Sequence, residues 1–396
     1  MLGSELDRTQ TPPPAWLQLA FRPFFLAASL YAIVAITLWL GIYVGGLELD
    51  LGHLSVYQWH AHEMLFGYSL AVIAGFTLTA AKNWTGVQTV YGTPLLFLLG
   101  AWSLARVFMI AGQAELAAIC DLGFALALCV ALGKPIIQQK HWGQLPIVGI
   151  LILLFIANAA FYSGAIGWTA QGAHYGVYSG LYLTLGIILL MGRRVVPFFI
   201  ERGVDGDVHL RNSKSIDIAI LGLFAAFAFA SLVPSLYAPA RYLALGLFIA
   251  TAYRYAGWYT PLLWQKPLLW SLYIALWFFT FGFFLYFASP LIGVSPFLAV
   301  HAFGYAGIGI ITLSMMSRVA LGHTGRDVQA PPASVALFLA LLIAGSAVRV
   351  LLPVFLPAAY FQLMILSQAL WIAAFATFTI QYYPYLTQAR IDGKTG

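Results

Sequence analysis

Twelve apolar runs, each long enough to cross a bilayer, constrain this chain more than any other feature of its sequence. About 20 residues are needed for a helix to cross the hydrocarbon core, and in lipid the backbone groups of such a run must bond within the segment, as they do in a helix. The pattern therefore predicts an all-α, polytopic membrane protein with twelve transmembrane helices. The runs cover residues 22–45, 57–81, 92–112, 115–133, 144–164, 169–192, 216–233, 239–257, 267–288, 296–320, 333–352 and 358–382.

The composition supports this fold class and leaves room for one domain only. The chain is 62% hydrophobic and 8% charged, whereas soluble proteins carry about 25% charged residues. The longest expected connection, residues 193–215, is too short for a second domain. We therefore expect a single transmembrane domain over residues 1–396, with cytoplasmic tails at residues 1–20 and 383–396.

The two cysteines point to no redox framework. Cys120 and Cys129 lie nine residues apart inside one apolar run, without a Cys-x-x-Cys or Cys-x-x-Cys-His motif. Neither a disulfide framework nor covalent attachment of a c-type haem is therefore indicated.

The basic residues predict the orientation of the chain in the membrane. With twelve spans, both termini lie on one side, and if that side is cytoplasmic, sixteen of the nineteen Lys and Arg residues also lie there. Only Arg106, Arg241 and Arg349 lie toward the other side. This asymmetry follows the positive-inside rule and accounts for the net charge of +6 without a nucleic-acid partner. We expect a multi-pass protein in the bilayer with both termini in the cytoplasm.

Polar residues gather near the outer ends of the expected helices, above all at the starts of helices 2, 6 and 10. Ionisable groups inside a membrane are costly and are rarely placed there without a partner or a function. At 1.5 Å per residue, these side chains share a depth to within roughly one to two helical turns. A ligand, cofactor or conduction site in the outer leaflet is therefore expected. The residues of this layer are His60, His62, Glu63, Arg106, Asp121, Asn158, His174, Arg241, His301 and Arg349.

Helical geometry limits which of these residues can cooperate. Glu63 shares a face with His60, whereas His62 is turned about 200° from His60. His174 and Tyr178 are four residues apart and share a face. Imidazole suits copper, zinc and iron and is a common axial ligand of haem. The alternative is that each histidine is an ordinary interfacial residue, that the arginines extend to the membrane surface, and that Tyr178 belongs to an interfacial aromatic belt.

Five unusual motifs carry a resemblance to a known family. They are Phe-Arg-Pro-Phe-Phe at 21–25, Trp-His-Ala-His-Glu-Met at 59–64, Asn-Trp-Thr-Gly at 83–86, Gly-Arg-Arg-Val-Val-Pro-Phe at 192–198, and Ser-Arg-Val-Ala-Leu-Gly-His-Thr-Gly-Arg at 317–326. At these motifs the chain resembles the NnrS family. The resemblance implies a protein of the bacterial inner membrane that contains haem and copper and acts in the nitric oxide response and in denitrification. Three of the motifs close the helices that open with histidine, which suggests a pseudo-threefold arrangement of four-helix groups.

The chain also resembles, more remotely, the catalytic subunits of haem–copper oxidases and nitric oxide reductases. These have twelve spans with histidines on helices 2, 6 and 10, and a His-x-x-x-Tyr copper motif similar to His174–Tyr178. Their helix 2 runs from a haem-ligating histidine to a Gly-Asn-Trp motif, comparable with His62 and Asn83-Trp84. Here the run 216–233 has no histidine pair, and helix 10 offers only His301. One haem between helices 2 and 10, rather than two haems, is therefore expected.

The resemblance implies roles for most residues of the layer and for Tyr178. A b-type haem would be bound by His62 and His301, while His60 and His174 would bind copper or complete a second centre; which of His60 and His62 is the primary ligand stays open. Glu63 would donate protons or support a ligand, and Tyr178 would act beside His174. The remaining residues of this assignment, which would bind the haem propionates, are Arg106, Arg241 and Arg349.

The leading hypothesis is an oxidoreductase that reduces or otherwise consumes nitric oxide, with quinol as the electron donor. Nitric oxide is apolar enough to reach such a site from the lipid. Two alternatives remain. Twelve spans with weak internal repeats also occur in secondary transporters, so the chain is alternatively a transporter or a metal- or haem-handling protein without turnover. It is alternatively a nitric oxide sensor that binds the gas without converting it.

Overall fold

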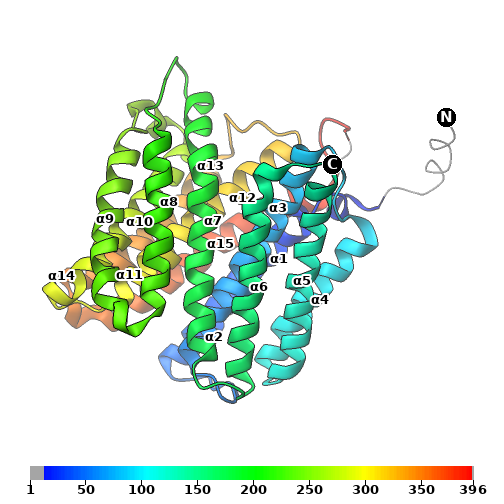
Figure 1. Cartoon of the computed structure of the whole chain (residues 1–396). Coiled ribbons are helices and arrows are strands. Elements are labelled where there is room, and N and C mark those ends of the chain that lie inside the picture. Colours follow the sequence, from blue (N-terminus) through cyan, green and yellow to red (C-terminus); the bar gives the residue numbers. More distant parts are fainter. Residues whose placement is uncertain (1–12, 395–396) are drawn as a thin grey trace.

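The computed structural model describes residues 13–394, and within this range it contains helices and no β-strand (Figure 1). Residues 1–12 of the expected N-terminal tail and residues 395–396 of the expected C-terminal tail lie outside the described residues. The long helical units are α1 (Phe21–Val44), α2–η2–α3 (Val56–Thr85), α4 (Gly92–Ile110), α5 (Ala114–Gln138), α6 (Leu145–Ala165), α7 (Gly172–Gly203), α8 (Lys214–Leu232), α9 (Tyr237–Ala256), α10 (Pro267–Ile292), α11–η6–α12 (Phe297–His323), α13–η7–α14 (Ala333–Phe355) and α15 (Tyr360–Thr387).

Each of the twelve expected spans corresponds to one of these helical units. Eleven units are long and apolar enough to cross a membrane. The other, α9, has 20 residues and packs between α8 and α10; Arg241 and Arg254 near its two ends lower its hydropathy. The expected all-α polytopic fold is confirmed.

Three of the long helical units change from α-helical to π-helical geometry. These π-helical segments are η2 (Glu63–Ser69), η6 (Ala302–Ile308) and η7 (Ala347–Leu351). The first two begin directly after His62 and His301, and the third contains Arg349. π-Helical turns are rare and occur frequently at functional sites. Nothing in the sequence pattern predicts them, and they change which residues face one another beyond this point of each helix.

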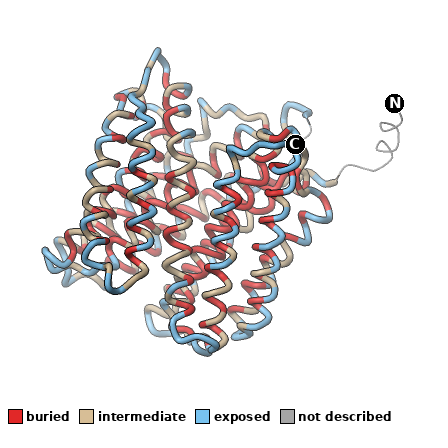
Figure 2. Tube along the Cα trace, in the orientation of Figure 1, coloured by how far each residue is buried: buried red, intermediate tan, exposed pale blue. Residues whose placement is uncertain are grey.

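Burial separates the central helices from the outer ones. Buried positions follow the inward faces of the helices, and exposed positions follow their outer faces (Figure 2). The most enclosed units are α2–η2–α3, α10 and α11–η6–α12, whereas α7 is considerably less enclosed. The expected pseudo-threefold arrangement would centre on the second, sixth and tenth spans, which are α2–η2–α3, α7 and α11–η6–α12. It stays a prediction, since α10, the ninth span, is about as enclosed as two of these three.

One expected boundary is wrong by about three helical turns. The helix expected to end at residue 192 continues to Gly203 in α7, so Arg193, Arg194 and Pro197 are helical and the connection to α8 is residues 204–213. Charged side chains near a membrane surface can extend into the polar region while their backbone stays helical. For this reason the first pair of arginines does not mark the helix end.

The N-terminal motif at 21–25 holds the C-terminal end of the chain. The Arg22 guanidinium donates hydrogen bonds to the backbone carbonyls of Tyr385, Leu386 and Gln388 at the end of α15. The last four carbonyls of a helix have no partner within that helix, so Arg22 satisfies groups that would otherwise face the interior. The start of α1 and the end of α15 therefore lie on the same side of the bundle, as an even number of spans requires.

Candidate functional site

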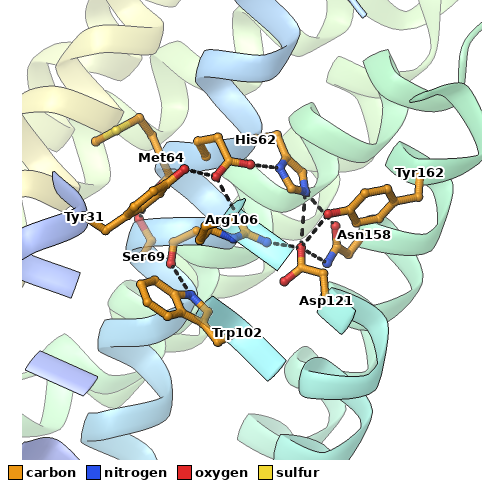
Figure 3. Close-up of polar contacts among 11 residues, drawn as sticks. Tyr31, His62, Met64, Ser69, Trp102, Arg106, Asp121, Asn158 and Tyr162 are labelled. Carbon is orange, nitrogen blue, oxygen red and sulfur yellow. Dashed lines mark hydrogen bonds and ion pairs between the residues drawn. The ribbon is translucent and has the colours of Figure 1, made fainter. Parts of the chain in front are cut away.

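Part of the expected polar layer converges into one buried group of side chains, which we call the charged cluster (Figure 3). It draws on α1, the junction of α2 and η2, α4, α5 and α6, and every member is buried. Segments far apart in the sequence therefore meet at one point in the bundle. The members are Tyr31, His62, Glu63, Arg106, Asp121, Asn158 and Tyr162.

Arg106 links the two carboxylates of the charged cluster. Its guanidinium forms one ion pair with Glu63, at 3.0 Å, and a second with Asp121. The side chains of all three are 3% exposed or less. Taking such charges out of water is expensive, and the loss is offset only when each charge is paired and hydrogen-bonded. Hydrogen bonds from Tyr31 to Glu63 and from Tyr162 to Asp121 provide that support.

The neighbours of His62 occupy both of its ring nitrogens. The Asn158 amide donates to Asp121 at 3.1 Å, so its oxygen faces Nε2 of His62 at 2.9 Å, and Nε2 must donate. Nδ1 lies 2.8 Å from Glu63 Oε1, and an ionised carboxylate can only accept. Glu63 and Nδ1 of His62 therefore share one proton, and the pair is neutral overall, as is the pair of Arg106 and Asp121. In this arrangement both ring nitrogens of His62 are engaged by neighbouring side chains, so neither is open to iron or copper.

His60 faces a different neighbourhood, as its 200° rotation from His62 predicts. Its ring stacks on Trp39 of α1, with ring centroids 4.4 Å apart, and its Nδ1 is buried without a partner among the described residues. His301 and Arg349 both lie close enough to His60 for their charges to interact. Arg349 also donates to the Tyr360 hydroxyl at 3.2 Å. We call His60, His301, Arg349 and Tyr360 the histidine group.

The histidine group presents donors that fit a metal held by imidazoles. Nδ1 of His301 lies 2.7 Å from the Phe297 carbonyl oxygen and therefore donates to it. This leaves a lone pair on Nε2, which accepts from the Arg349 guanidinium at 2.7 Å. Histidines that bind metals commonly donate their other ring nitrogen to a backbone carbonyl in this way. His301 therefore has the tautomer that a metal ligand needs, with its Nε2 lone pair directed toward a cation. Nδ1 of His60 is a further buried nitrogen without a partner among the described residues.

The structure does not join the remaining expected site residues to these two groups. The rings of His174 and Tyr178 contact each other, with centroids 4.7 Å apart. Among residues 13–394, however, no hydrogen bond, ion pair or ring contact links His174 to His60, His62 or His301. Arg241 donates to the Phe287 carbonyl instead of a carboxylate. Throughout that range, no three His, Cys, Asp or Glu side chains gather in a way that could hold a metal ion.

Several members of the two groups were not expected from the sequence. Tyr31, Tyr162 and Tyr360 are three of 21 tyrosines, and tyrosine is common at membrane interfaces, so residue type alone does not single them out. One signal was available for Tyr162, because it lies four residues after Asn158 and so shares its face of α6. No comparable signal marks Tyr31 or Tyr360.

Comparison with known proteins agrees with the motifs. No curated protein matches the chain. The family model described as NnrS protein matches residues 15–390, which includes every residue of the charged cluster and of the histidine group. The chain therefore belongs to the NnrS family of membrane proteins.

Proposed function

We propose that the protein binds nitric oxide in the outer leaflet and consumes it, using a b-type haem held by His60 and His301. Membership of the NnrS family supports a role in the nitric oxide response. The observation that carries the proposal is the tautomer of His301, whose Nε2 keeps a lone pair and accepts from the Arg349 guanidinium. His60 is the second candidate, because its buried Nδ1 has no partner among the described residues. Because both nitrogens of His62 are occupied, we assign the second ligand to His60 rather than His62.

The residues around the histidine group prepare it for an anionic cofactor and a gaseous substrate. When bound, haem would supply electrons to nitric oxide, for which one of the two histidines would have to give up its position. The Arg349 guanidinium is 5% exposed and pairs with no carboxylate among the described residues, so it is suited to a haem propionate. Trp39 covers one face of the His60 ring and excludes water from it. Reduction of nitric oxide also takes up protons, and Glu63 lies one turn along the same helix from His60.

Copper and quinol are also part of the proposal. Copper near His174 would have His174 and Tyr178 as its donors, and we route no step through it. Quinol is proposed as the electron donor because the chain has no motif for covalent haem. The bacterial inner membrane and cytoplasmic termini are proposed from the family resemblance and the distribution of Lys and Arg.

Four histidine variants of the purified protein test the proposal. We expect His60→Ala and His301→Ala to lose bound haem and the Soret band. His62→Gln should keep haem, although it weakens the charged cluster. His209→Ala is the matched control, because this residue is 87% exposed and should have no effect. Unchanged haem content in the first two variants refutes the assignment.

The wild-type protein separates the competing functions. A colourless preparation favours a transporter or a metal-handling protein. A Soret band that shifts with nitric oxide, without formation of nitrous oxide under anaerobic turnover with quinol, favours a sensor. Nitrous oxide production that depends on quinol supports the enzyme.

A further inference from the structure

The inner halves of α3 and α7 leave a recess between them, which we call the apolar recess. Nearer its outer end, α7 packs against α2 and η2, where Gly180 lies against the ring of Phe66. The helix α3 is not among those that α7 contacts closely, so α3 and α7 diverge toward the inner side. The recess has a volume of about 90 Å³, and residues of α1, α3, α7, α10 and α12 line it.

The lining of the apolar recess offers no free hydrogen-bond donor to a ligand. All of its side chains are apolar except Thr77 and Thr312, whose hydroxyls donate to the backbone carbonyls of Ile73 and Ile308. None of the lining residues is exposed, and the half-buried ones lie mostly on α7. The recess therefore opens beside α7, toward the surrounding lipid.

The size of the apolar recess favours a flexible chain over a ring. An apolar cavity of about 150 Å³ can bind benzene, and this recess is smaller. Two of its half-buried lining residues are Met191 and Met315, and methionine side chains adapt readily to the shape of a neighbour. Lipid acyl chains are the flexible apolar molecules that surround a protein in a bilayer. One such chain can enter the recess from the side without leaving the hydrocarbon.

A basic side chain lies at the inner end of the apolar recess. Arg318 follows Ile311 by seven residues and Met315 by three, so it shares the face of α12 that lines the recess. The Arg318 guanidinium carbon lies 3.8 Å from the centroid of the Phe199 ring on α7. Phe199 follows Val195 of the lining by four residues. The helices α7 and α12 therefore still face each other one turn beyond the recess, with Arg318 between them.

Arg318 has no counter-charge within the described part of the chain. The side chain is half-buried, and its guanidinium stacks on Phe199 but forms no hydrogen bond or ion pair with any of residues 13–394. Charged side chains within membrane spans usually pair with one another or with backbone carbonyls. Arg193 and Arg254 follow this rule, since both pair with Asp217. We therefore expect an anion from outside the chain to neutralise Arg318.

The depth of Arg318 matches that of lipid phosphates. The unit α11–η6–α12 has 27 residues and is about 40 Å long, whereas the hydrocarbon core is about 30 Å thick. Arg318 lies five residues before the end of α12, so its guanidinium can reach the polar interface. In the proposed orientation this is the cytoplasmic interface. Basic pockets between helices on that side bind anionic lipid headgroups.

We propose that the protein binds one anionic phospholipid of the cytoplasmic leaflet, with an acyl chain in the apolar recess and the phosphate on the Arg318 guanidinium. The planar guanidinium can bond two phosphate oxygens at once, and its stacking on Phe199 orients it. Two family motifs meet at this site, because Gly192 belongs to the motif at 192–198 and Arg318 to that at 317–326. The bound lipid fills the gap between α3 and α7 and stabilises the inner half of the bundle. This inference goes beyond the proposed function and needs neither haem nor nitric oxide.

Lipid binding to the purified full-length protein tests the proposal. The probes are phosphatidylglycerol, which is anionic, and phosphatidylcholine, which has no net charge; native mass spectrometry and the rise in melting temperature measure their binding. We expect Arg318→Gln to bind phosphatidylglycerol about tenfold more weakly than wild type, which is equivalent to about 1.4 kcal/mol. Arg194→Gln is the matched control, because it removes the same charge from an exposed position on the inner side. This control should bind as wild type does.

A second pair of variants tests the recess itself. Gly192 lines the recess, and a Cβ there would meet nothing within 4 Å, so Gly192→Leu places a side chain where the acyl chain would lie. We expect this variant to bind both lipids more weakly. Gly100→Leu is its control, since a Cβ at Gly100 also meets nothing within 4 Å and this residue does not line the recess.

Each alternative result overturns part or all of the proposal. If wild type binds phosphatidylglycerol no more tightly than phosphatidylcholine, the proposal fails, whether or not the variants fold. If Arg318→Gln binds phosphatidylglycerol as wild type does, Arg318 does not hold the phosphate. An equal loss in Arg318→Gln and Arg194→Gln would show general attraction to the basic inner surface, which refutes a specific site. Unchanged binding by Gly192→Leu would show that the acyl chain does not occupy the recess.

Discussion

Replacing Arg106 by leucine should destabilise the protein more than replacing any other arginine of the outer leaflet. The guanidinium is paired with the carboxylates of Glu63 and Asp121, and all three side chains are buried. Removing one partner of a buried ion pair costs about 3–5 kcal/mol, because the other charge is left uncompensated. In Arg106→Leu two carboxylates remain against His62 alone. We therefore expect a loss of about 4 kcal/mol, within that range.

A second substitution should recover part of this loss. In Arg106→Leu/Asp121→Asn the remaining charges are Glu63 and His62, which lie 2.8 Å apart and balance each other. We expect a coupling energy of about 1–3 kcal/mol between the two substitutions, as for residues within one network. The measurement is the free energy of unfolding of wild type, both single variants and the double variant in the same detergent micelles. Arg241→Leu is the control, since this half-buried arginine donates to the Phe287 carbonyl, lies over the Phe287 ring and pairs with no carboxylate among the described residues. Its loss should cost about 1 kcal/mol.

Two outcomes would refute the reasoning. If Arg106→Leu lowers the free energy of unfolding no more than Arg241→Leu does, the ion pairs of Arg106 contribute little to stability. If the changes in unfolding free energy caused by Arg106→Leu and Asp121→Asn are additive, Arg106 and Asp121 do not share a charge network.

Three further predictions follow from the geometry. Gly67→Ala should lower stability by about 1–3 kcal/mol, because its Cβ would lie 2.9 Å from the Arg106 guanidinium. Gly100→Ala is the control, since a Cβ at Gly100 meets nothing within 4 Å. Equal melting temperatures of the two variants in thermal unfolding would contradict the close contact at Gly67. Arg22→Leu should expose the end of α15, so limited proteolysis should remove the C-terminal segment faster than in wild type; an unchanged rate would show that the carbonyl contacts do not hold it. In a background without cysteine, a membrane-impermeant reagent should label Trp168→Cys from outside and Asp207→Cys only from the cytoplasmic side, since both sites are exposed; the reverse pattern would overturn the orientation.

The spans follow from the sequence because lipid imposes a one-dimensional rule. A helix that bonds its own backbone needs only length and apolarity to cross the membrane, and both can be read from a single segment. All twelve runs are helices for this reason, even α9 with its two arginines. The end of α7 could not be read in the same way, because the helix continues through Arg193 and Arg194 into the interfacial region.

The polar layer was also readable in outline, because buried charges are rare enough to be informative. The expected rotation between His60 and His62 holds, since α2 is a regular helix from Val56 to His62. The sequence could not show which partner each histidine meets. That depends on helices from other parts of the chain, such as α6, which brings Asn158 to His62.

What the sequence by itself determined is therefore the membrane fold, the depth of the polar residues and the family. The tertiary structure alone decided the grouping, placing His62 in a charge-balanced cluster and His60 with His301 and Arg349. The physical reason is that depth is set within one helix, whereas partners are set by packing between helices. The three π-helical segments alter that packing at the positions where the site residues lie.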